Sequence, residues 1–404
     1  MHVKCLLVIA AAVAVCWSTA SAVGPFEIVA PDSTVLRLQL AAQLQSAWES
    51  KDKGSGVERD ESVYMKARRI RPTLSVTVPE YKTSFRLHLS TAPGSIELMD
   101  LYFDTRLKKD LTVRAGQYKI PFTRYRIQSF QRLTFVDWSI VTKYFGAERQ
   151  LGIAVHNGYE KAPALAYAAG LFSGVNARSS HAVGLASIFG EPVSNPSDLS
   201  AASARSEFHP EFVAHVSYNA GGIDVSMDSD ADGGEVRYSL AVSAAWDIDP
   251  AVYQDLALRL SPECLIKYRH FALMGAAFIG FVDINGSQRT RLAMTGLLVQ
   301  GAWRVHRRFE LAARYADVDI DAAVADAALA RAAAIMGGSD DDETVNRYKD
   351  AGRVRGEREG TVAATIYLDE HNLKVQNDVG FTVRNRIDHD RTDYLVRTQI
   401  QLSF

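Results

Sequence analysis

The chain has 404 residues and a formal net charge of −2, with 47% hydrophobic and 23% charged residues. This near-neutral balance argues against nucleic acid as a partner, because nucleic-acid-binding domains carry basic patches. The hydrophobic content is that of an ordinary globular protein, so composition alone does not separate a soluble β-sandwich from a membrane barrel. The order of polar and apolar side chains has to make that distinction.

The N-terminus has the pattern of an export signal. Lys4 gives a positive start, the apolar run 6–17 follows, and the small residues that end at Ala22 fit a cleavage site. We therefore predict cleavage after Ala22. A lipoprotein cut before Cys16 is the alternative, but Val15 occupies a position where a small residue is preferred.

The rest of the chain offers neither a disulfide nor a helical anchor. Once the leader is removed, Cys264 is the one cysteine left, so no disulfide can form within the chain. The longest later apolar run, residues 271–282, is shorter than the ~20 residues that a membrane-spanning helix needs. Export without a helical anchor leaves the periplasm, secretion or an outer-membrane β-barrel.

Alternating segments begin at residue 35. In residues 35–45, one face carries Leu36, Leu38, Leu40, Ala42 and Leu44, and the other carries Arg37, Gln39, Gln43 and Gln45. Segments 85–89, 100–104 and 111–115 repeat the pattern. Strands of about ten residues, apolar on one face and polar on the other, are typical of a barrel with lipid outside and water inside.

One irregularity interrupts this series. Near Arg68 and Arg69 the polar positions slip by one residue, which predicts a β-bulge. Pro72 follows, and we expect it at a strand end or at the bulge, since proline cannot donate to a ladder hydrogen bond.

A long basic connection separates the next two strands. From Lys119 to Arg149 there are six basic residues and two acids, Asp137 and Glu148. Cationic side chains inside a pore attract anions and lower the cost of their partial dehydration. We interpret the connection as a loop that folds into the mouth of a barrel and narrows it; a solvated surface loop is the alternative.

The second half of the chain continues the strands. Candidates are 151–155, 164–172, 212–227, 235–246, 256–260, 265–281, 292–303, 309–316, 361–368, 372–383 and 393–404. Residues 175–210 are expected to form an exposed loop. The stretch Asp319–Gly360 is expected to be an external loop with a short helix over 321–336. The last strand ends with Phe404 on its apolar face, which resembles the C-terminal assembly signal of bacterial outer-membrane barrels.

The connection 228–234 contains Asp228, Asp230, Asp232 and Gly233, which resemble the start of a calcium loop. The twelfth position is Ser239 rather than glutamate, so a polar turn is the preferred interpretation and no metal site is predicted. The chain lacks the Gly-x-Ser-x-Gly, Walker and His-Glu-x-x-His motifs. We therefore predict neither catalytic residues nor a cofactor.

At roughly 22–24 residues for each strand with its connection, the mature length accommodates about 16 strands, a barrel wide enough for an aqueous channel. The predicted architecture is thus an all-β, transmembrane antiparallel barrel over residues 23–404, preceded by a signal peptide over residues 1–22. Its predicted partner is the lipid bilayer of the bacterial outer membrane.

Several fragments resemble the phosphate-selective porin O/P family. They are Ala67-Arg68-Arg69 with Leu74-Ser75, Asp100-x-Tyr102, Gly116-Gln117-Tyr118-Lys119-x-Pro121-Phe122, Phe135-Val136-Asp137 and Arg149-x-x-Gly152-Ile153. The resemblance implies a homotrimer of 16-stranded barrels that passes small anions such as phosphate. It also implies that the third external loop folds inward and builds the constriction.

The resemblance also suggests site residues. Lys119 matches the lysine of the family motif, and Arg124, Arg126 and Arg132 belong to the matching loop, so these four are the predicted constriction and anion-binding residues. Five arginines on predicted lumen faces could extend a basic track along the wall: Arg37, Arg86, Arg114, Arg237 and Arg397. Acids on the same faces, such as Asp100 and Asp104, could equally pair with them. General anion preference is favoured over strict phosphate selectivity.

Three functions remain open on the sequence. The first is an anion-preferring diffusion channel, and the second is a closed or plugged barrel that acts as an adhesin, scaffold or membrane enzyme. A soluble sandwich is the third.

Overall fold

The structure is a computed structural model that describes residues 25–54, 56–91, 96–146, 149–173, 210–247, 256–283, 290–323, 325–326 and 353–404. The predicted signal peptide lies outside these residues, as do nearly all of the predicted loop 175–210 and most of the predicted helix. Residues 322, 323, 325 and 326 of that helix are described, and they are helical. Among the described residues, no helix is long and apolar enough to cross a membrane.

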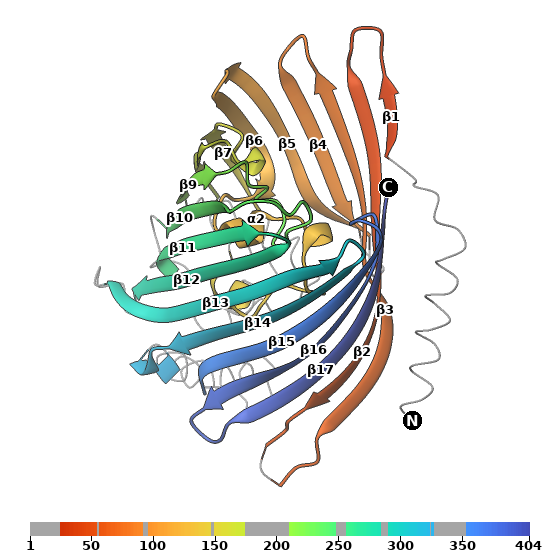
Figure 1. Ribbon diagram of the computed structural model, residues 1–404. Helices are drawn as coiled ribbons and strands as arrows, with labels where there is room; N and C mark the ends of the chain where they lie inside the picture. Colours follow the sequence, from red (N-terminus) through yellow and green to blue (C-terminus); the bar gives the residue numbers. More distant parts are fainter. Residues whose placement is uncertain are drawn as a thin grey trace.

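Sixteen antiparallel strands form one closed ring (Figure 1). The sheet has 17 strands, of which the short β1 (Phe26–Val29) pairs with the start of β2 and stands outside the ring. The last strand, β17, pairs with β2 from Ser403↔Ala41 to Tyr394↔Ser50, and this pairing closes the barrel. The predicted barrel of about 16 strands is confirmed.

The strands follow one another around the ring in sequence order. They are β2 (Val35–Lys51), β3 (Asp60–Val78), β4 (Thr83–Ser90), β5 (Glu97–Lys108), β6 (Leu111–Lys119), β7 (Arg149–His156), β8 (Leu165–Phe172), β9 (Glu211–Ala220), β10 (Arg237–Asp247), β11 (Leu256–Tyr268), β12 (Phe271–Asp283), β13 (Thr290–His306), β14 (Phe309–Ile320), β15 (Val354–Asp369), β16 (Leu373–Arg386) and β17 (Arg391–Ser403).

The predicted alternation holds on β2. Leu44 is 57% exposed on the outer surface, whereas Gln43 and Gln45 are buried inside the barrel. The predicted bulge is also present, because the register of β2 against β3 shifts between Gln43↔Arg69 and Leu44↔Ala67, which makes Arg68 the extra residue. The expectation for Pro72 was wrong: it lies within β3, opposite Leu40, where the backbone groups of Leu40 bond to Phe404 instead.

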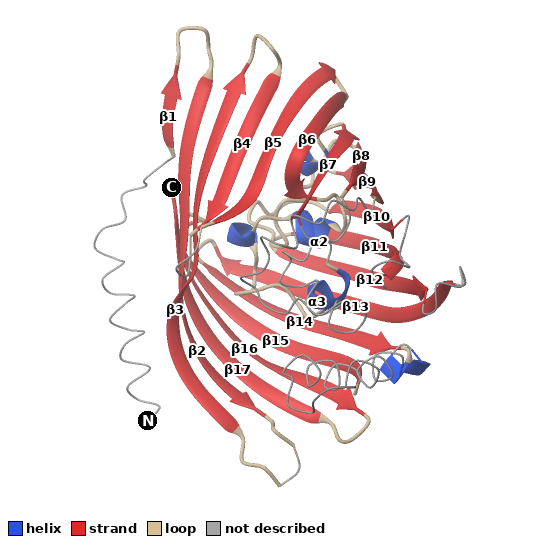
Figure 2. Ribbon diagram, turned by 180° about the vertical axis from the view of Figure 1, so that it is seen from behind, coloured by secondary structure: helices blue, strands red, loops and turns tan. Residues whose placement is uncertain are grey.

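Two connections fold into the lumen from opposite ends of the barrel. The inner loop (residues 120–146) leaves the end where Lys119 pairs with Arg149, and it carries the helices α2 (Arg124–Ile127), η1 (Phe130–Arg132) and α3 (Val141–Phe145). Helices α2 and α3 lie within the curve of the sheet (Figure 2). The inward turn (residues 221–236) joins β9 to β10 at the other end.

The lumen is divided into two unlike halves. Next to β11–β14, an apolar cluster joins Tyr125, Tyr144 and Phe145 of the inner loop to Leu265, Met274, Ala276, Phe278, Met294 and Leu298 of the strands. The rings of Phe145 and Phe278 stack with centroids 5.3 Å apart. Polar residues therefore do not line the whole interior, as the alternation had suggested, because here the inner loop and not water covers the inner face.

Candidate functional site

The other half of the lumen contains a cavity of about 600 Å³ between the inner loop and strands β2–β9. Among the residues that the structure describes, eight basic ones line this cavity: Arg71, Arg86, Arg114, Lys119, Arg124, Arg132, Arg149 and Lys161. Three acids line it: Asp100, Glu160 and Asp224. The basic side chains come from several strands, the inner loop and η2 (Tyr159–Lys161), so the cavity is a meeting point of segments distant in sequence.

Two of the three acids are engaged in close ion pairs. Asp100 accepts a hydrogen bond of 2.6 Å from Nε of Arg149 and also contacts His88 at 2.7 Å. Glu160 accepts a hydrogen bond of 2.9 Å from Nη1 of Arg114. Burial alone would raise the pKa of Glu160, but the charge of Arg114 and its hydrogen bond lower it, so Glu160 is an anion at neutral pH.

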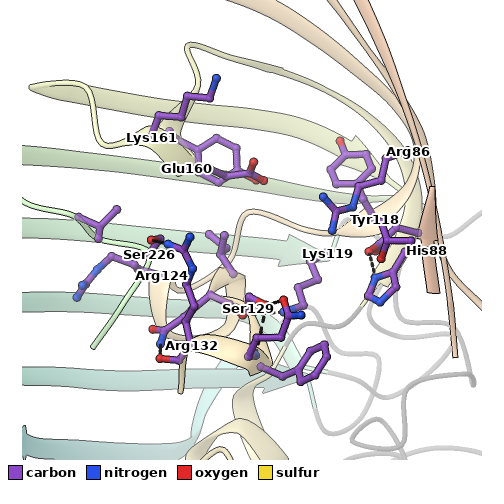
Figure 3. A pocket seen from close by; sticks show the side chains of 18 of the residues that line it. Arg86, His88, Tyr118, Lys119, Arg124, Ser129, Arg132, Glu160, Lys161 and Ser226 are labelled. Carbon is purple, nitrogen blue, oxygen red and sulfur yellow. Dashed lines mark hydrogen bonds and ion pairs between the residues drawn. The ribbon is translucent and has the colours of Figure 1, made fainter. Parts of the chain in front are cut away.

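Three guanidinium groups at the cavity form no ion pair with a carboxylate in the described part of the chain. Arg71 and Arg124 have buried side-chain nitrogens without a hydrogen-bond acceptor, and Arg124 is 6% exposed. Arg86 lines the cavity from β4 and forms no ion pair with any described residue. In Figure 3, Arg86 and Arg124 approach the cavity from different sides. Unpaired cations on several sides of one cavity create a positive potential inside it.

Arg71 was not among the predicted site residues, although the sequence carries the signal for it. After the bulge at Arg68, the inward positions of β3 are Arg69, Arg71 and Thr73. Reading the alternation onward from the predicted bulge would have placed Arg71 in the lumen. Its guanidinium lies 4.7 Å from the ring centre of Phe130 in the inner loop.

The Gly116-Gln117-Tyr118-Lys119 motif shapes the point where the inner loop begins. Gly116 has φ +134°, and a Cβ atom there would lie 2.2 Å from the carbonyl oxygen of Leu101. Gln117 donates to the carbonyls of Leu98 and Met99, which the irregular pairing of β4 with β5 leaves available. These contacts fix the end of β6, which sets the direction in which the loop enters the barrel.

Lys119 lines the cavity and also holds the loop. Its Nζ donates to the backbone carbonyls of Arg126 and Gln128 at 3.0 and 2.9 Å. At the other end of α2, the carboxylate of Glu263 on β11 accepts from the backbone N–H groups of Arg124 and Tyr125. Helix α2 is therefore held at both ends, by the ammonium group of Lys119 on its carbonyls and by the carboxyl oxygens of Glu263 on its N–H groups.

The remaining predicted loop residues differ in their surroundings. Arg126 is buried, and its guanidinium lies 4.2 Å from the ring centre of Trp138. Arg132 is half exposed; it donates to Ser226 of the inward turn and lies 3.7 Å from the carboxylate of Asp224. The structure thus brings Lys119, Arg124 and Arg132 to one cavity and packs Arg126 against an indole ring beside it.

The predicted wall arginines are mostly engaged in ion pairs. Arg114 bonds Asp104 through two nitrogens at 2.8 Å, and Arg397 bonds Asp378 at 2.7 and 2.6 Å. Arg237 bonds Asp230 in the inward turn. Arg37 pairs with Glu27 at an exposed end of the barrel. Of these five, Arg86 is the cavity residue without such a pair among the described residues.

Wall residues hold the inner loop by its backbone. Lys374 and Gln376 of β16 donate to the carbonyl of Leu133 at 2.8 and 2.9 Å, and Gln401 of β17 donates to the carbonyl of Gln131. Arg314 of β14 donates to the carbonyl of Asp137. These inward-facing polar side chains therefore hold the loop and are not among the residues that line the cavity.

The comparisons with known proteins agree with this architecture. A family model described as phosphate-selective porin O and P matches residues 38–338, which is more than half of the chain. No curated protein matches the chain.

Among solved structures, the outer membrane channel DcaP of Acinetobacter baumannii is similar with a TM-score of 0.56 and 10% identity, over 93% of this chain and 99% of that one. OprB of Pseudomonas putida is similar with a TM-score of 0.55 and 10% identity, over 91% of this chain and 94% of that one. An anion-selective porin from Comamonas acidovorans is similar with a TM-score of 0.53 and 12% identity, over 92% of this chain and 100% of that one. At these identities the likeness establishes the barrel fold alone.

Proposed function

This chain belongs to the family of phosphate-selective porins O and P, and we propose that it forms an anion-preferring diffusion channel in the bacterial outer membrane. The family and the fold support a porin-type channel rather than an enzyme. The preference for anions rests on one observation: eight cations and three carboxylates line the cavity beside the inner loop, and two of those carboxylates are held in close ion pairs.

The inner loop supports the same proposal as the constriction. It fills the β11–β14 side of the lumen and leaves the cavity between itself and β2–β9. Arg71, Arg86 and Arg124 face that space with no carboxylate partner among the described residues, and Lys119, with its ammonium on two backbone carbonyls, adds a further positive charge. A cation without a tight counter-charge can exchange one passing anion for the next, as conduction requires.

Reversal potentials in planar bilayers test this proposal. The purified wild-type protein, in a salt gradient of potassium chloride, should give an ohmic current whose reversal potential favours chloride. Replacing Arg86 and Arg124 together with glutamate should reduce or reverse the preference. A wild-type channel that favours potassium would contradict the proposal.

Phosphate is the finer question, and guanidinium groups suit it because their planar donors pair with two oxygens at once. We propose general anion preference with phosphate among the solutes. Adding phosphate to a chloride current distinguishes the cases, because a phosphate-selective site would block chloride at low phosphate concentration. A merely anion-preferring channel would show a small, additive change.

The filled half of the lumen favours the second candidate, a plugged barrel that acts as an adhesin or scaffold. The apolar cluster includes Ala325 and Val354 as well as the inner loop, so packing extends from the loop to the ends of β14 and β15. Absence of any bilayer current from correctly folded protein would favour this alternative over the channel.

The proposed homotrimer is supported by a polar row on the outer face of the barrel. Ser46, Thr398 and Asn377 are register neighbours on β2, β17 and β16, between outward apolar residues such as Leu44 and Val396. Thr398 donates to Asn377, whose amide nitrogen has no partner among the described residues. Polar groups are costly against lipid, and a neighbouring copy would supply partners for them.

The proposed export step has its own test. N-terminal sequencing of the mature protein should begin at Val23, after the proposed cut at Ala22. A mature chain that begins at Cys16 with an attached lipid would instead favour the lipoprotein alternative.

A further inference from the structure

The carboxylate of Asp228, in the inward turn, binds the inner loop although the two segments enter the barrel from opposite ends. One oxygen, Oδ1, accepts from Nε2 of Gln128 at 3.0 Å and from the backbone N–H and hydroxyl of Thr134 at 3.2 and 2.9 Å. The other oxygen, Oδ2, accepts from Nε2 of Gln300 on β13 at 2.6 Å. One buried side chain, 3% exposed, thus joins the turn, the loop and the wall.

The neighbouring aspartates of the same turn have different tasks. Asp230 accepts from the backbone N–H groups of Gly233 and His270 and pairs with Arg237, so it fixes the turn to its own end of the barrel. The side chain of Asp232 is 67% exposed and lies 3.6 Å from Arg237. The Asp-x-Asp-x-Asp-Gly segment is therefore a polar turn. Among the described residues, Asp228 is the one of its three aspartates that accepts hydrogen bonds from the inner loop.

Asp228 is not one of the residues that line the cavity, whereas Asp224, Val225 and Ser226 of the same turn do line it. Its position therefore argues for a mechanical role and against a direct effect of its charge on a passing ion. The loop residues that it holds, Gln128 and Thr134, bracket Ser129–Arg132, and this segment contributes four residues to the lining.

We propose that Asp228 is a positioning residue that sets the place of the inner loop from the opposite end of the barrel. Through it, the inward turn fixes the segment that presents Arg132 to the cavity. The consequence for ion passage rests on the channel function proposed above, but the placement of the loop does not depend on it.

Two substitutions separate a positioning role from an electrostatic one. Asp228→Ala removes all four hydrogen bonds, whereas Asp228→Asn removes the charge and keeps Oδ1 for Gln128 and Thr134. In the wild type, Oε1 of Gln300 is buried without a hydrogen-bond partner among the described residues. If the side-chain amide of Gln300 flips, this oxygen can accept a hydrogen bond from the new amide N–H of the Asp228→Asn variant. Positioning predicts that Asp228→Asn resembles the wild type, while a charge effect predicts that it resembles Asp228→Ala.

Hydrogen–deuterium exchange of residues 128–138 in the folded, detergent-solubilised full chain reports loop placement without any current. Asp228→Ala should speed exchange of this segment by roughly tenfold or more, since it removes the three hydrogen bonds by which Gln128 and Thr134 hold this carboxylate. Asp228→Asn and the exposed control Asp232→Ala should match the wild type. In bilayers, Asp228→Ala alone should show unsteady single-channel conductance.

The loop-side partners provide a variant that leaves the turn intact. Should Asp228→Ala fail to fold, judged by heat-modifiable migration on gels, the double variant Gln128→Leu with Thr134→Val removes the two side-chain hydrogen bonds to Asp228 and keeps the one from the Thr134 backbone N–H. It should therefore also speed exchange, by a smaller factor. Unchanged exchange in the folded Asp228→Ala or the double variant would overturn the proposal. So would a folded Asp228→Asn whose exchange matches Asp228→Ala. A cation-favouring wild-type channel, by contrast, would defeat the channel proposal and leave this one standing.

Discussion

The carboxylate of Asp137, in the inner loop, accepts a hydrogen bond of 2.9 Å from the guanidinium of Arg69 on β3. Arg68 reaches the same carboxylate at 2.7 Å. Successive strand residues normally point to opposite faces, and the bulge at Arg68 is what lets two adjacent arginines reach one carboxylate. An irregularity in the wall thereby anchors the loop that crosses the lumen.

This anchor predicts how the loop responds to acid. Burial alone would raise the pKa of Asp137, but Arg69 and Arg68 lower it well below its usual range. A carboxylate with a depressed folded-state pKa contributes stability that is fully present above its unfolded pKa of about 3.9 and is lost as pH falls through the folded value. We expect the fluorescence of the neighbouring Trp138, isolated by comparison with Trp138→Phe, to stay constant from neutral pH to about 5 and to change only at lower pH, as Asp137 becomes protonated.

Asp137→Asn tests the same anchor at neutral pH. Removing one partner of a largely buried ion pair costs roughly 3 kcal/mol, so the loop should exchange its amide hydrogens faster and the acid response should shrink. An Asp137→Asn protein with the exchange and acid response of the wild type would show that the pair does not hold the loop.

Arg86 offers the cleanest test of the cavity charge. Arg86→Gln removes a cavity cation that has no ion pair among the described residues, so it should lower the preference for chloride without disturbing the barrel. The shift should be larger at 0.1 M than at 1 M salt, because the screening length falls from about 10 Å to about 3 Å. The matched control, Arg37→Gln, removes an exposed arginine paired with Glu27 and should leave the reversal potential unchanged.

Gly116 should tolerate no side chain. Gly116→Ala combines a positive φ with a Cβ atom driven against the Leu101 carbonyl, so it should lower the free energy of unfolding by about 2 kcal/mol or more. Urea unfolding of the detergent-folded barrel measures this cost. In the control Gly275→Ala, the nearest contact is Sγ of Cys264 at 3.3 Å, and the cost should be much smaller.

Asn377→Leu tests the proposed subunit contact, because its effect on stability should have opposite signs against a protein neighbour and against lipid. If another copy covers the polar row, leucine removes a partner and the oligomer should dissociate more readily on unheated gels. If lipid covers the row, leucine should stabilise the barrel, because an apolar side chain suits hydrocarbon better than an amide does. A more stable barrel with no change in oligomer would contradict the trimer contact at this face.

Local pattern was sufficient for the wall of the barrel but not for its interior. Period-two alternation in residues 35–45 predicts which side chains face outward, and the slip at Arg68 predicts the bulge, because both depend on neighbours in the sequence. The filling of the β11–β14 side depends on Phe145 meeting Phe278, more than a hundred residues away. No spacing rule links such positions.

The same limit applies to the charges. Arg86 and Arg114 look alike in the sequence, since each lies on the polar face of an alternating strand. Arg114 is neutralised by Asp104, a register neighbour, and by Glu160 on a separate turn, whereas Arg86 forms no ion pair with any described residue. The assembled barrel therefore decides which arginines lack an ion pair, and the sequence alone does not identify them.

The inner loop packs against one side of the lumen, so the cavity lies on the other side, away from the barrel axis. An ion in the cavity would have charged side chains on the β3–β6 side and, beyond the inner loop, packed aromatic and aliphatic side chains that form a region of low dielectric constant. Charges facing such a boundary act over a longer range than they would in open water. A few arginines on one side of the cavity are then enough to make the potential in the proposed channel positive, even though the protein as a whole is slightly acidic.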